Sequence, residues 1–575
     1  MTSPAFLVRS LTASLMALIL LSGVAVEGAV PAAQAASITV TTFADEVAVN
    51  GQCSLREALL AANRNAPVDS CKAGRRADTI RLAAGRYELT LQGILEDAGE
   101  TGDLDITGRL SIVGAGRDAT VIAGDPTDRV FDVHASGALT LASLSVLGQS
   151  DLLHAPNPDE PGYFTHGRGG GIRNQGGELA LVSATVTGRS YGHGGCRYCW
   201  DGEGGGIANE GGTLSITNSQ VSGKAAWGGA VAIISGKAVI NDSQFTGEAI
   251  EYGGTFLLYG AQTVMTRVMI TGSRSQGQAV ITGGPGGTLT IRNSELRDNW
   301  GGISNVGPGH LELYDTVIAD NVATLTGPRG DNGPGAISNG GTAELIRVSV
   351  LNNAGGHGGA IANGGVLVIR DSTIAGNSGL PGAIDSSGDA SSLTLINTTV
   401  SGNRALGDES PSAISMADGL IRSSTIVHNE GASEALWIAS GRLANSVIAD
   451  NVSTYGFPSP DCGSGIYESP GTFTSLGYNL IENGSNCVAD GDDSTDIRGV
   501  DPLLGPLADN GGATLTHLPL PGSPLIDAGN PAKSSKADAA CPARDQIGTK
   551  RPQDGDGDRK ARCDVGAVER LAPRR

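Results

Sequence analysis

The sequence predicts an all-β protein whose body is a right-handed parallel β-helix, a three-sheet solenoid closed by a cap at each end. Two observations predict this class. A unit of glycine, a small residue and an aliphatic residue recurs at a nearly constant interval, and glycine accounts for 87 of 575 residues while aromatic residues make up only 4%. The glycines follow no strict third-residue period, which excludes collagen.

The repeat is about two dozen residues long. Most successive aliphatic markers lie 22 to 25 residues apart, and three intervals are longer because the chain carries insertions there. The markers are Ile172, Ile207, Val231, Phe256, Val280, Ile303, Ile337, Ile361, Ile384, Ile414 and Leu436. One unit cannot bury an apolar face alone. Stacked units can, because each strand pairs with its equivalents about 4.8 Å above and below.

Each unit has a second half in which apolar and polar residues alternate, as in the run Leu214-Ser215-Ile216. Such alternation is strand periodicity. In seven units an asparagine follows three residues after the last apolar position, and we expect these amides to stack as a ladder inside a turn. The ladder residues are Asn299, Asn321, Asn353, Asn377, Asn403, Asn429 and Asn451.

Residues 1–35 are typical of an export signal. Arg9 gives the positive start, residues 11–26 are largely apolar, and Ala33-Gln34-Ala35 offers a small-x-small cleavage site. No later segment has the roughly 20 consecutive apolar residues that a membrane span needs. We therefore expect a secreted mature chain without a transmembrane segment.

The remaining chain divides into three parts. Residues 36–103 are expected to form the amino-terminal cap and the first coils, because Ser54 and Glu57 make a capping-box pattern before an apolar run and a short helix can cover the open strand edges. Residues 104–452 hold the repeats. Residues 453–575 are rich in Pro, Gly and Asp, and we expect them to form a disulfide-bearing carboxyl-terminal cap domain.

Eight cysteines in an exported chain favour disulfides, and they occur as close sequence neighbours. The expected pairs are Cys53 with Cys71, Cys196 with Cys199, Cys462 with Cys487, and Cys541 with Cys563. Eight cysteines allow about 105 connectivities, so this pairing is a hypothesis. The Cys196-x-x-Cys199 pair has a redox or metal-binding interpretation as an alternative.

Two end motifs resemble known bacterial families. The run Cys53-Ser54-Leu55-Arg56-Glu57-Ala58 resembles the signature of the secreted CSLREA family. The tail is similar to the choice-of-anchor Q domain in the segments Gly477-Tyr478-Asn479-Leu480, Asp501-Pro502-Leu503-Leu504, Ser523-Pro524-Leu525-Ile526-Asp527 and Cys563-Asp564-Val565-Gly566. The central repeats resemble those of polymorphic outer-membrane proteins. The resemblance implies an extracellular or cell-surface setting and fixes no reaction.

The charge balance narrows the choice of partner. The formal net charge is −20, and no lysine or arginine cluster is present, so nucleic acid is excluded as an expected partner. An acidic polysaccharide would be repelled at long range unless Ca²⁺ or a local basic patch intervened. We expect a monomer, with a polysaccharide or cell-surface molecule as its ligand.

The candidate site is a stripe of side chains that runs across neighbouring coils. Four residues before successive markers lie Arg168, Glu203, Trp227, Tyr252, Gln276 and Asn299, and His357 occupies the same place further on. Aromatic faces beside carboxylates suit sugar rings, and the rise per coil is close to the length of one sugar residue. An inserted loop adds Tyr191 and Trp200, so we expect Trp227, Tyr252, Tyr191 and Trp200 to bind the ligand.

Catalysis would draw on the same region. Asp201 and Glu203 are the candidate acid/base pair, and Arg168 or His193 could neutralise a charge or remove a proton. The alternative is that all four are solvated turn residues. Gly192-His193-Gly194 matches a motif of polygalacturonase-like enzymes, but the Asp-Asp and Arg-x-Lys partners are missing, and Gly356-His357-Gly358 shows how readily the motif arises in this sequence.

A separate pattern near the carboxyl end suggests a Ca²⁺ site. Asp554, Asp556 and Asp558 alternate with glycine, so their carboxylates can converge on a hard cation. Arg559 and Val565 stand where an EF-hand loop has Gly and Glu, and a solvated turn is the alternative. The sequence therefore favours a non-catalytic extracellular binding or structural protein, with a polysaccharide lyase or glycoside hydrolase as the second hypothesis.

Overall fold

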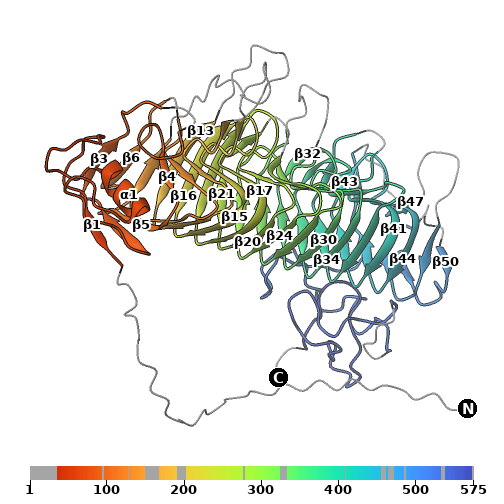
Figure 1. Ribbon diagram of the computed structural model, residues 1–575. Coiled ribbons are helices and arrows are strands. Elements are labelled where there is room, and N and C mark those ends of the chain that lie inside the picture. The colour runs from red at the N-terminus through yellow and green to blue at the C-terminus, as the bar shows by residue number, and fades with distance from the viewer. Residues whose placement is uncertain are drawn as a thin grey trace, which may run out of the picture. The chain divides into compact units, whose positions relative to one another are not determined.

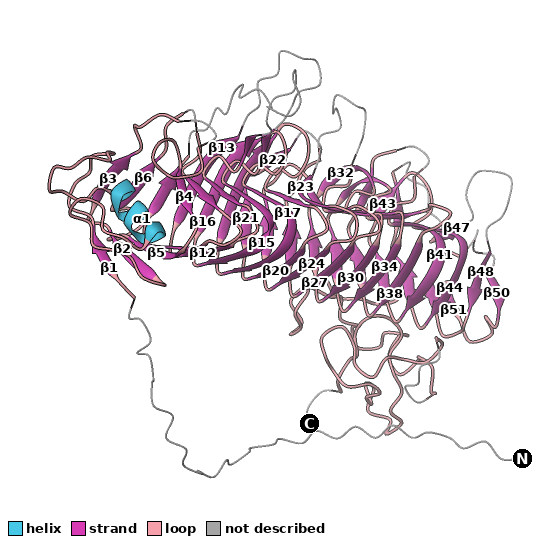
Figure 2. Ribbon diagram, in the orientation of Figure 1, coloured by secondary structure: helices cyan, strands magenta, loops and turns pink. Residues whose placement is uncertain are grey.

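Stacks of short parallel strands make up the body of the protein (Figures 1 and 2). The computed structural model describes residues 35–93, 96–126, 128–148, 167–190, 202–275, 279–323, 333–407, 410–454, 461–463, 472–484, 487, 489–532 and 538–572. All pairings between its named strands are parallel, and only one α-helix is present in these residues. The expected all-β parallel β-helix is therefore confirmed.

The first stack contains the marker positions. It begins with β4 (Leu104–Ile106) and β7 (Phe131–Val133), continues through β11 (Ile172–Asn174) and β15 (Ile207–Thr217), and reaches β47 (Cys462–Gly463). Ile172 pairs with Ile207, which pairs with Val231 in β17 (Val231–Asn241). The aliphatic side chains thus form one inward column, as the spacing predicts.

Two further stacks complete each coil. The second runs from β1 (Ser37–Thr39) to β50 (Ala489–Gly491) and joins the first stack in one sheet, because long strands such as β15 belong to both. The third runs from β3 (Gly85–Glu88) to β51 (Ile497–Arg498). Between the third stack of one coil and the first stack of the next lie very short strands, among them β10 (Gly167–Arg168) and β14 (Gly202–Glu203).

The asparagine ladder is confirmed. Asn353 Nδ2 donates to Asn377 Oδ1 at 3.0 Å, and Asn377 Nδ2 donates to Asn403 Oδ1 at 2.9 Å. The same bond joins every consecutive pair from Asn299 to Asn451. A second amide ladder, which the repeat analysis did not predict, links Asn305, Asn339 and Asn363 in the first stack.

The amino end is closed as predicted. Helix α1 (Leu55–Arg64) begins after Ser54, whose side chain accepts from the backbone of Glu57 while Glu57 accepts from that of Ser54. Arg56 is fully buried, pairs with Asp45 at 2.7 Å, and donates to the carbonyl oxygen of Gly102 just before β4. This buried arginine attaches the cap to the first coils.

The coils extend beyond residue 452. Strands β48 (Thr472–Ser475) and β49 (Leu480–Ile481) continue the second and third stacks, and β50 and β51 follow them. Residues 500–532 and 538–572, here called the tail, then turn back along the flank of earlier coils (Figure 1). There the Thr399 hydroxyl donates to Gln546 Oε1 at 2.7 Å, and the backbone N–H of Ala567 donates to Thr425.

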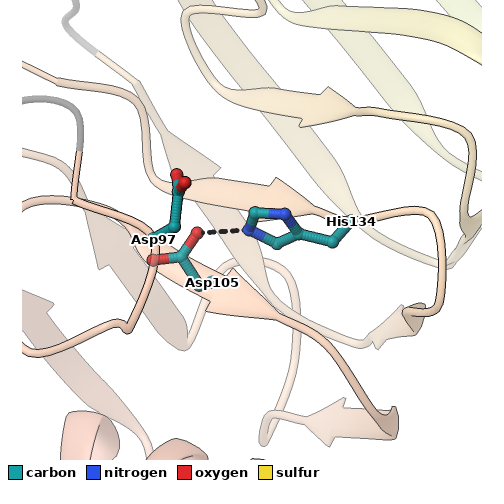
Figure 3. Close-up of side chains that lie close together, drawn as sticks. All are labelled: Asp97, Asp105 and His134. Atoms are coloured by element: carbon teal, nitrogen blue, oxygen red, sulfur yellow. Dashed lines mark hydrogen bonds and ion pairs between the residues drawn. The ribbon is translucent and has the colours of Figure 1, made fainter.

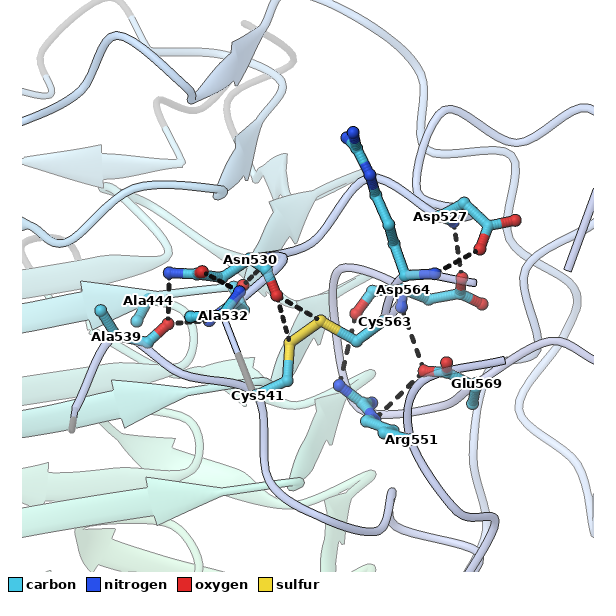
Figure 4. Close-up of a disulfide and its surroundings, with 12 residues drawn as sticks. Ala444, Asp527, Asn530, Ala532, Ala539, Cys541, Arg551, Cys563, Asp564 and Glu569 are labelled. Atoms are coloured by element: carbon cyan, nitrogen blue, oxygen red, sulfur yellow. Dashed lines mark hydrogen bonds and ion pairs between the residues drawn. A yellow bond between two sulfur atoms is a disulfide. The ribbon is translucent and has the colours of Figure 1, made fainter. Parts of the chain in front are cut away.

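Three of the four expected disulfides lie in described residues and are confirmed. They join Cys53 to Cys71, Cys462 to Cys487, and Cys541 to Cys563. Figure 4 shows the last of these beside the buried Arg551–Glu569 ion pair. Cys196 and Cys199 lie outside the described residues.

Two positions differ from the predicted alignment. Phe256 pairs with Ile281 rather than with Val280. The reason is a β-bulge: between two successive paired positions, β23 (Ala279–Gly283) has one residue more than β26 (Gly302–Asn305). Asn299 is buried in the amide ladder, so it does not belong to the exposed stripe of the candidate site.

Candidate ligand-binding face

The residues four places before the first markers do form a column. Arg168 in β10 pairs in register with Glu203 in β14, and Glu203 forms a β-bridge with Trp227. The Trp227 and Tyr252 rings follow, with centroids 5.6 Å apart and an interplanar angle of 54°. Neighbouring backbones in register hold this row of side chains.

A tight turn carries each member of the column. Gly204, which follows Glu203, has a φ of +64°, and a Cβ atom there would lie 2.1 Å from the carbonyl oxygen of Ile207. Only glycine fits such a close backbone approach. The turn leads the chain from Glu203 into the marker strand, and the same conformation recurs at Gly169, Gly228 and Gly253.

Ion pairs connect this column with the adjacent strands. Arg168 contacts Glu203 and Glu210, each at 2.8 Å, and Arg173 Nε lies 2.7 Å from Glu210 Oε1. Burial acts to raise the pKa of Glu210, but its hydrogen bonds and charge interactions with Arg173 and Arg168 outweigh that effect and lower the pKa. Glu210 is therefore an ionised hydrogen-bond acceptor at neutral pH.

The network continues toward the amino end. Asp132 in β7 accepts from Arg129 at 2.7 Å and from Gln175 at 2.8 Å, and Arg129 also contacts Asp103 at 3.2 Å. Burial is the main cause that raises the pKa of Asp103 well above its ordinary value, and Arg129 opposes it. We call the whole set the polar face: Asp103, Arg129, Asp132, Arg168, Arg173, Glu203, Glu210, Trp227 and Tyr252.

The repeat alignment found only part of this face. It missed Asp132, Arg173 and Glu210, although a signal was present in the sequence. Asp132 and Arg173 each follow the inward residue of their coil directly, where Ala208 and Ala232 stand in the next coils. The change from charged residues to alanine at one register position distinguishes these two coils from the two that follow them.

The expected sites differ in how far they can be described. Tyr191, His193, Trp200 and Asp201 lie outside the described residues, so the pairing of Asp201 with Glu203 remains a prediction. Arg168 and Glu203, the other two members of the expected catalytic set, form an ion pair with each other. His357 lies exposed in β32 (Ala354–His357), far along the solenoid from them.

The expected Ca²⁺ ligands are only partly brought together. Asp554 and Asp556 converge with Asp527, their carboxylate oxygens lying within 4.8 Å of one another. Asp558 is instead 3.6 Å from the Lys560 ammonium. Asp527 Oδ2 already accepts from the backbone N–H groups of Gly555 and Asp556, so these carboxylates also stabilise the local turn.

Comparisons with known proteins give distant structural neighbours only. No protein-family model and no curated protein sequence matches the chain, so the resemblance of its two end motifs stays a prediction. A crystal structure of pectate lyase Pel9A aligns at 12% identity with a TM-score of 0.24, covering 93% of this chain and 96% of that one. Tailspike protein 3 of bacteriophage CBA120 aligns at 11% identity with a TM-score of 0.24, covering 70% and 58%.

No helix among the described residues is long and apolar enough to cross a bilayer. The three described disulfides are typical of proteins in oxidising compartments.

Proposed function

We propose that this protein is an extracellular, non-catalytic solenoid that binds a neutral carbohydrate along its polar face. One observation carries the proposal: the paired rings of Trp227 and Tyr252 continue a column of ion-paired residues, Arg168 and Glu203, over successive coils. Aromatic faces supply apolar contact for the C–H surface of a sugar ring. Guanidinium and carboxylate groups supply donors and acceptors for its hydroxyls.

The state of Glu210 and Glu203, the two carboxylates in contact with Arg168, favours binding over acid catalysis. A general acid must hold a proton near neutral pH, so its pKa is raised. Glu210 has a lowered pKa, and Glu203 is held by Arg168. The arginines are occupied in the same way and do not offer an uncompensated positive charge to a substrate carboxylate. With a chain charge of −20, this favours a neutral glycan over a polyanionic one.

The test is a glycan array probed with the full chain, followed by titration of the best ligand. We expect Trp227→Ala and Tyr252→Ala each to weaken binding about 10-fold, equivalent to about 1.4 kcal/mol. Trp437→Ala is the matched control, since Trp437 lies partly exposed in β44 (Leu436–Ala444), many coils from the polar face. If the two face variants bind as tightly as the parent, the proposed site is wrong.

The same preparation tests the enzyme hypothesis. Polysaccharides incubated with the full chain are assayed for new reducing ends and for the ultraviolet absorbance of unsaturated products. We expect neither signal. Turnover that is lost in Glu203→Gln would overturn the non-catalytic assignment and would favour the acid/base pair of Glu203 with Asp201.

A further inference from the structure

Three side chains from three separate segments meet beside the polar face (Figure 3). Asp97 lies in the connection before β4, Asp105 lies within β4, and His134 follows β7. One ligand atom from each lies within 4.8 Å of the others. Asp105 Oδ1 and His134 Nε2 are 2.7 Å apart.

The Asp105 carboxylate is only half satisfied. Its side chain is 1% exposed, yet Oδ2 has no hydrogen-bond partner among the described residues. A buried acceptor without a partner costs about 1 to 3 kcal/mol, and more when it carries charge. Asp132 Oδ1 also has no hydrogen-bond partner among the described residues, but the Asp132 carboxylate contacts arginine, as Glu210 does, whereas the Asp105 carboxylate contacts only His134.

The surroundings of this oxygen are negative. Asp132 pairs with Asp105 in register, and Glu96 is also close enough to act on it electrostatically. Arg129 and Arg173 both pair with Asp132. The surroundings of Asp105 therefore hold more carboxylates than arginines, an excess that a cation would neutralise, and the exposed Asp97 connects the cluster with solvent.

We propose that Asp97, Asp105 and His134 form a binding site for a divalent transition-metal ion, with Zn²⁺ as the best match. One imidazole nitrogen and two carboxylate oxygens suit Zn²⁺, with a fourth position open to water or a ligand. Ca²⁺ and Mg²⁺ prefer oxygen ligands alone. Zn²⁺ would ligate His134 Nε2 and the Asp105 carboxylate, with the neutral imidazole carrying its proton on Nδ1.

Metal–ligand distances near 2.1 Å require modest movement. The exposed Asp97 side chain can approach, whereas Asp105 and His134 are fixed on adjacent coils by strand pairing. Asp132, the in-register neighbour of Asp105, is paired with Arg129 and Arg173 and is not counted as a ligand. The proposal is independent of carbohydrate binding, because none of the three ligands belongs to the polar face.

The experiment is calorimetric titration of the metal-free full chain with Zn²⁺, with Co²⁺ absorption as the spectroscopic probe of coordination. We expect one ion bound with micromolar or tighter affinity and uptake weakened about 10-fold or more in Asp97→Asn and in His134→Ala. Asp97 is exposed, so its variant tests the site without disturbing the core.

His310→Ala is the matched control. His310 Nε2 also lies near a carboxylate, at 3.2 Å from Glu312, but no third ligand is grouped with that pair among the described residues. We expect this variant to bind Zn²⁺ like the parent. The proposal is overturned if the chain takes up no Zn²⁺, or if uptake is unchanged in Asp97→Asn and His134→Ala, as it would be for an ion held by Asp527, Asp554 and Asp556.

Discussion

The asparagine ladder gives the sharpest test of how the coils are held together. Asn377 is fully buried, and its Oδ1 accepts from the backbone N–H of Asn353 at 2.8 Å and from Asn353 Nδ2 at 3.0 Å. Its own Nδ2 donates to Asn403 Oδ1 at 2.9 Å and to the Val350 carbonyl at 3.0 Å. Asn377→Ala therefore removes the acceptor of the Asn353 backbone N–H and of one N–H of the Asn353 amide, whereas Asn403 Oδ1 still accepts from the backbone N–H of residue 377.

Each orphaned buried donor costs about 1 to 3 kcal/mol, so the two donors together predict a loss of about 4 kcal/mol. In a solenoid each coil contacts only its neighbours, so the loss should be local. The measurement is hydrogen exchange followed by mass spectrometry, in which about 4 kcal/mol corresponds to exchange roughly 1,000-fold faster in β31 (Ser349–Leu351), β35 (Thr373–Ala375) and β39 (Thr399–Ser401).

Two further variants make the result interpretable. Asn377→Ser should recover part of the protection, because Ser273 occupies the ladder next to Asn299 and the serine hydroxyl can accept. Asn241→Ala in β17 is the control, since Asn241 is partly exposed. The ladder argument fails if Asn377→Ala and Asn241→Ala change exchange equally, or if the faster exchange spreads evenly along the solenoid.

Three other predictions follow from buried polar groups. Burial raises the pKa of Asp461 to about 7, so the folded state keeps a proton that the unfolded state loses from about pH 4 upward. The stability that this proton contributes is therefore lost as the pH rises through 7. In Asp461→Asn, the free energy of unfolding should lack this part of its pH dependence. Ser54→Ala should cost about 1 kcal/mol in urea unfolding by removing the helix cap, and an unchanged midpoint would contradict the cap. Arg551→Met leaves Glu569 buried without its cation, which should cost about 3 to 5 kcal/mol of stability. This loss should appear as faster amide hydrogen exchange in the tail but not in the first coils.

The solenoid could be predicted from the sequence because the residues that specify each coil lie close together in the chain and recur in every repeat. Spacing of aliphatic residues placed Ile172, Ile207 and Val231 in one column, and the strand register agrees. The bulge at Ile281 broke the alignment by one residue, because a single inserted residue leaves no periodic trace. The capping box at Ser54 was readable because it depends on two residues three apart.

The polar face was harder to predict because its contacts join different columns of the solenoid. Arg168 precedes its marker by four residues, whereas Glu210 follows its own by three, and the two meet only because a left-handed glycine turns the chain between them. Alignment of equivalent positions shows which residues stack along the axis. It does not show which columns face one another across a turn.

The tail contacts the third stack at residues that depart from the repeat, as the residues of the polar face also do. Thr373, Thr399 and Thr425 occupy one register position, are buried, and bond to Leu515, Gln546 and Ala567 of the tail. At the equivalent place in earlier coils, Gln220 and Gln244 are exposed. A run of short β-branched side chains replaces long polar ones where the tail lies. The threonine column thus departs from the repeat where the tail covers it. The coils of the polar face also depart together from the repeat, and this parallel is consistent with the ligand that we propose for them.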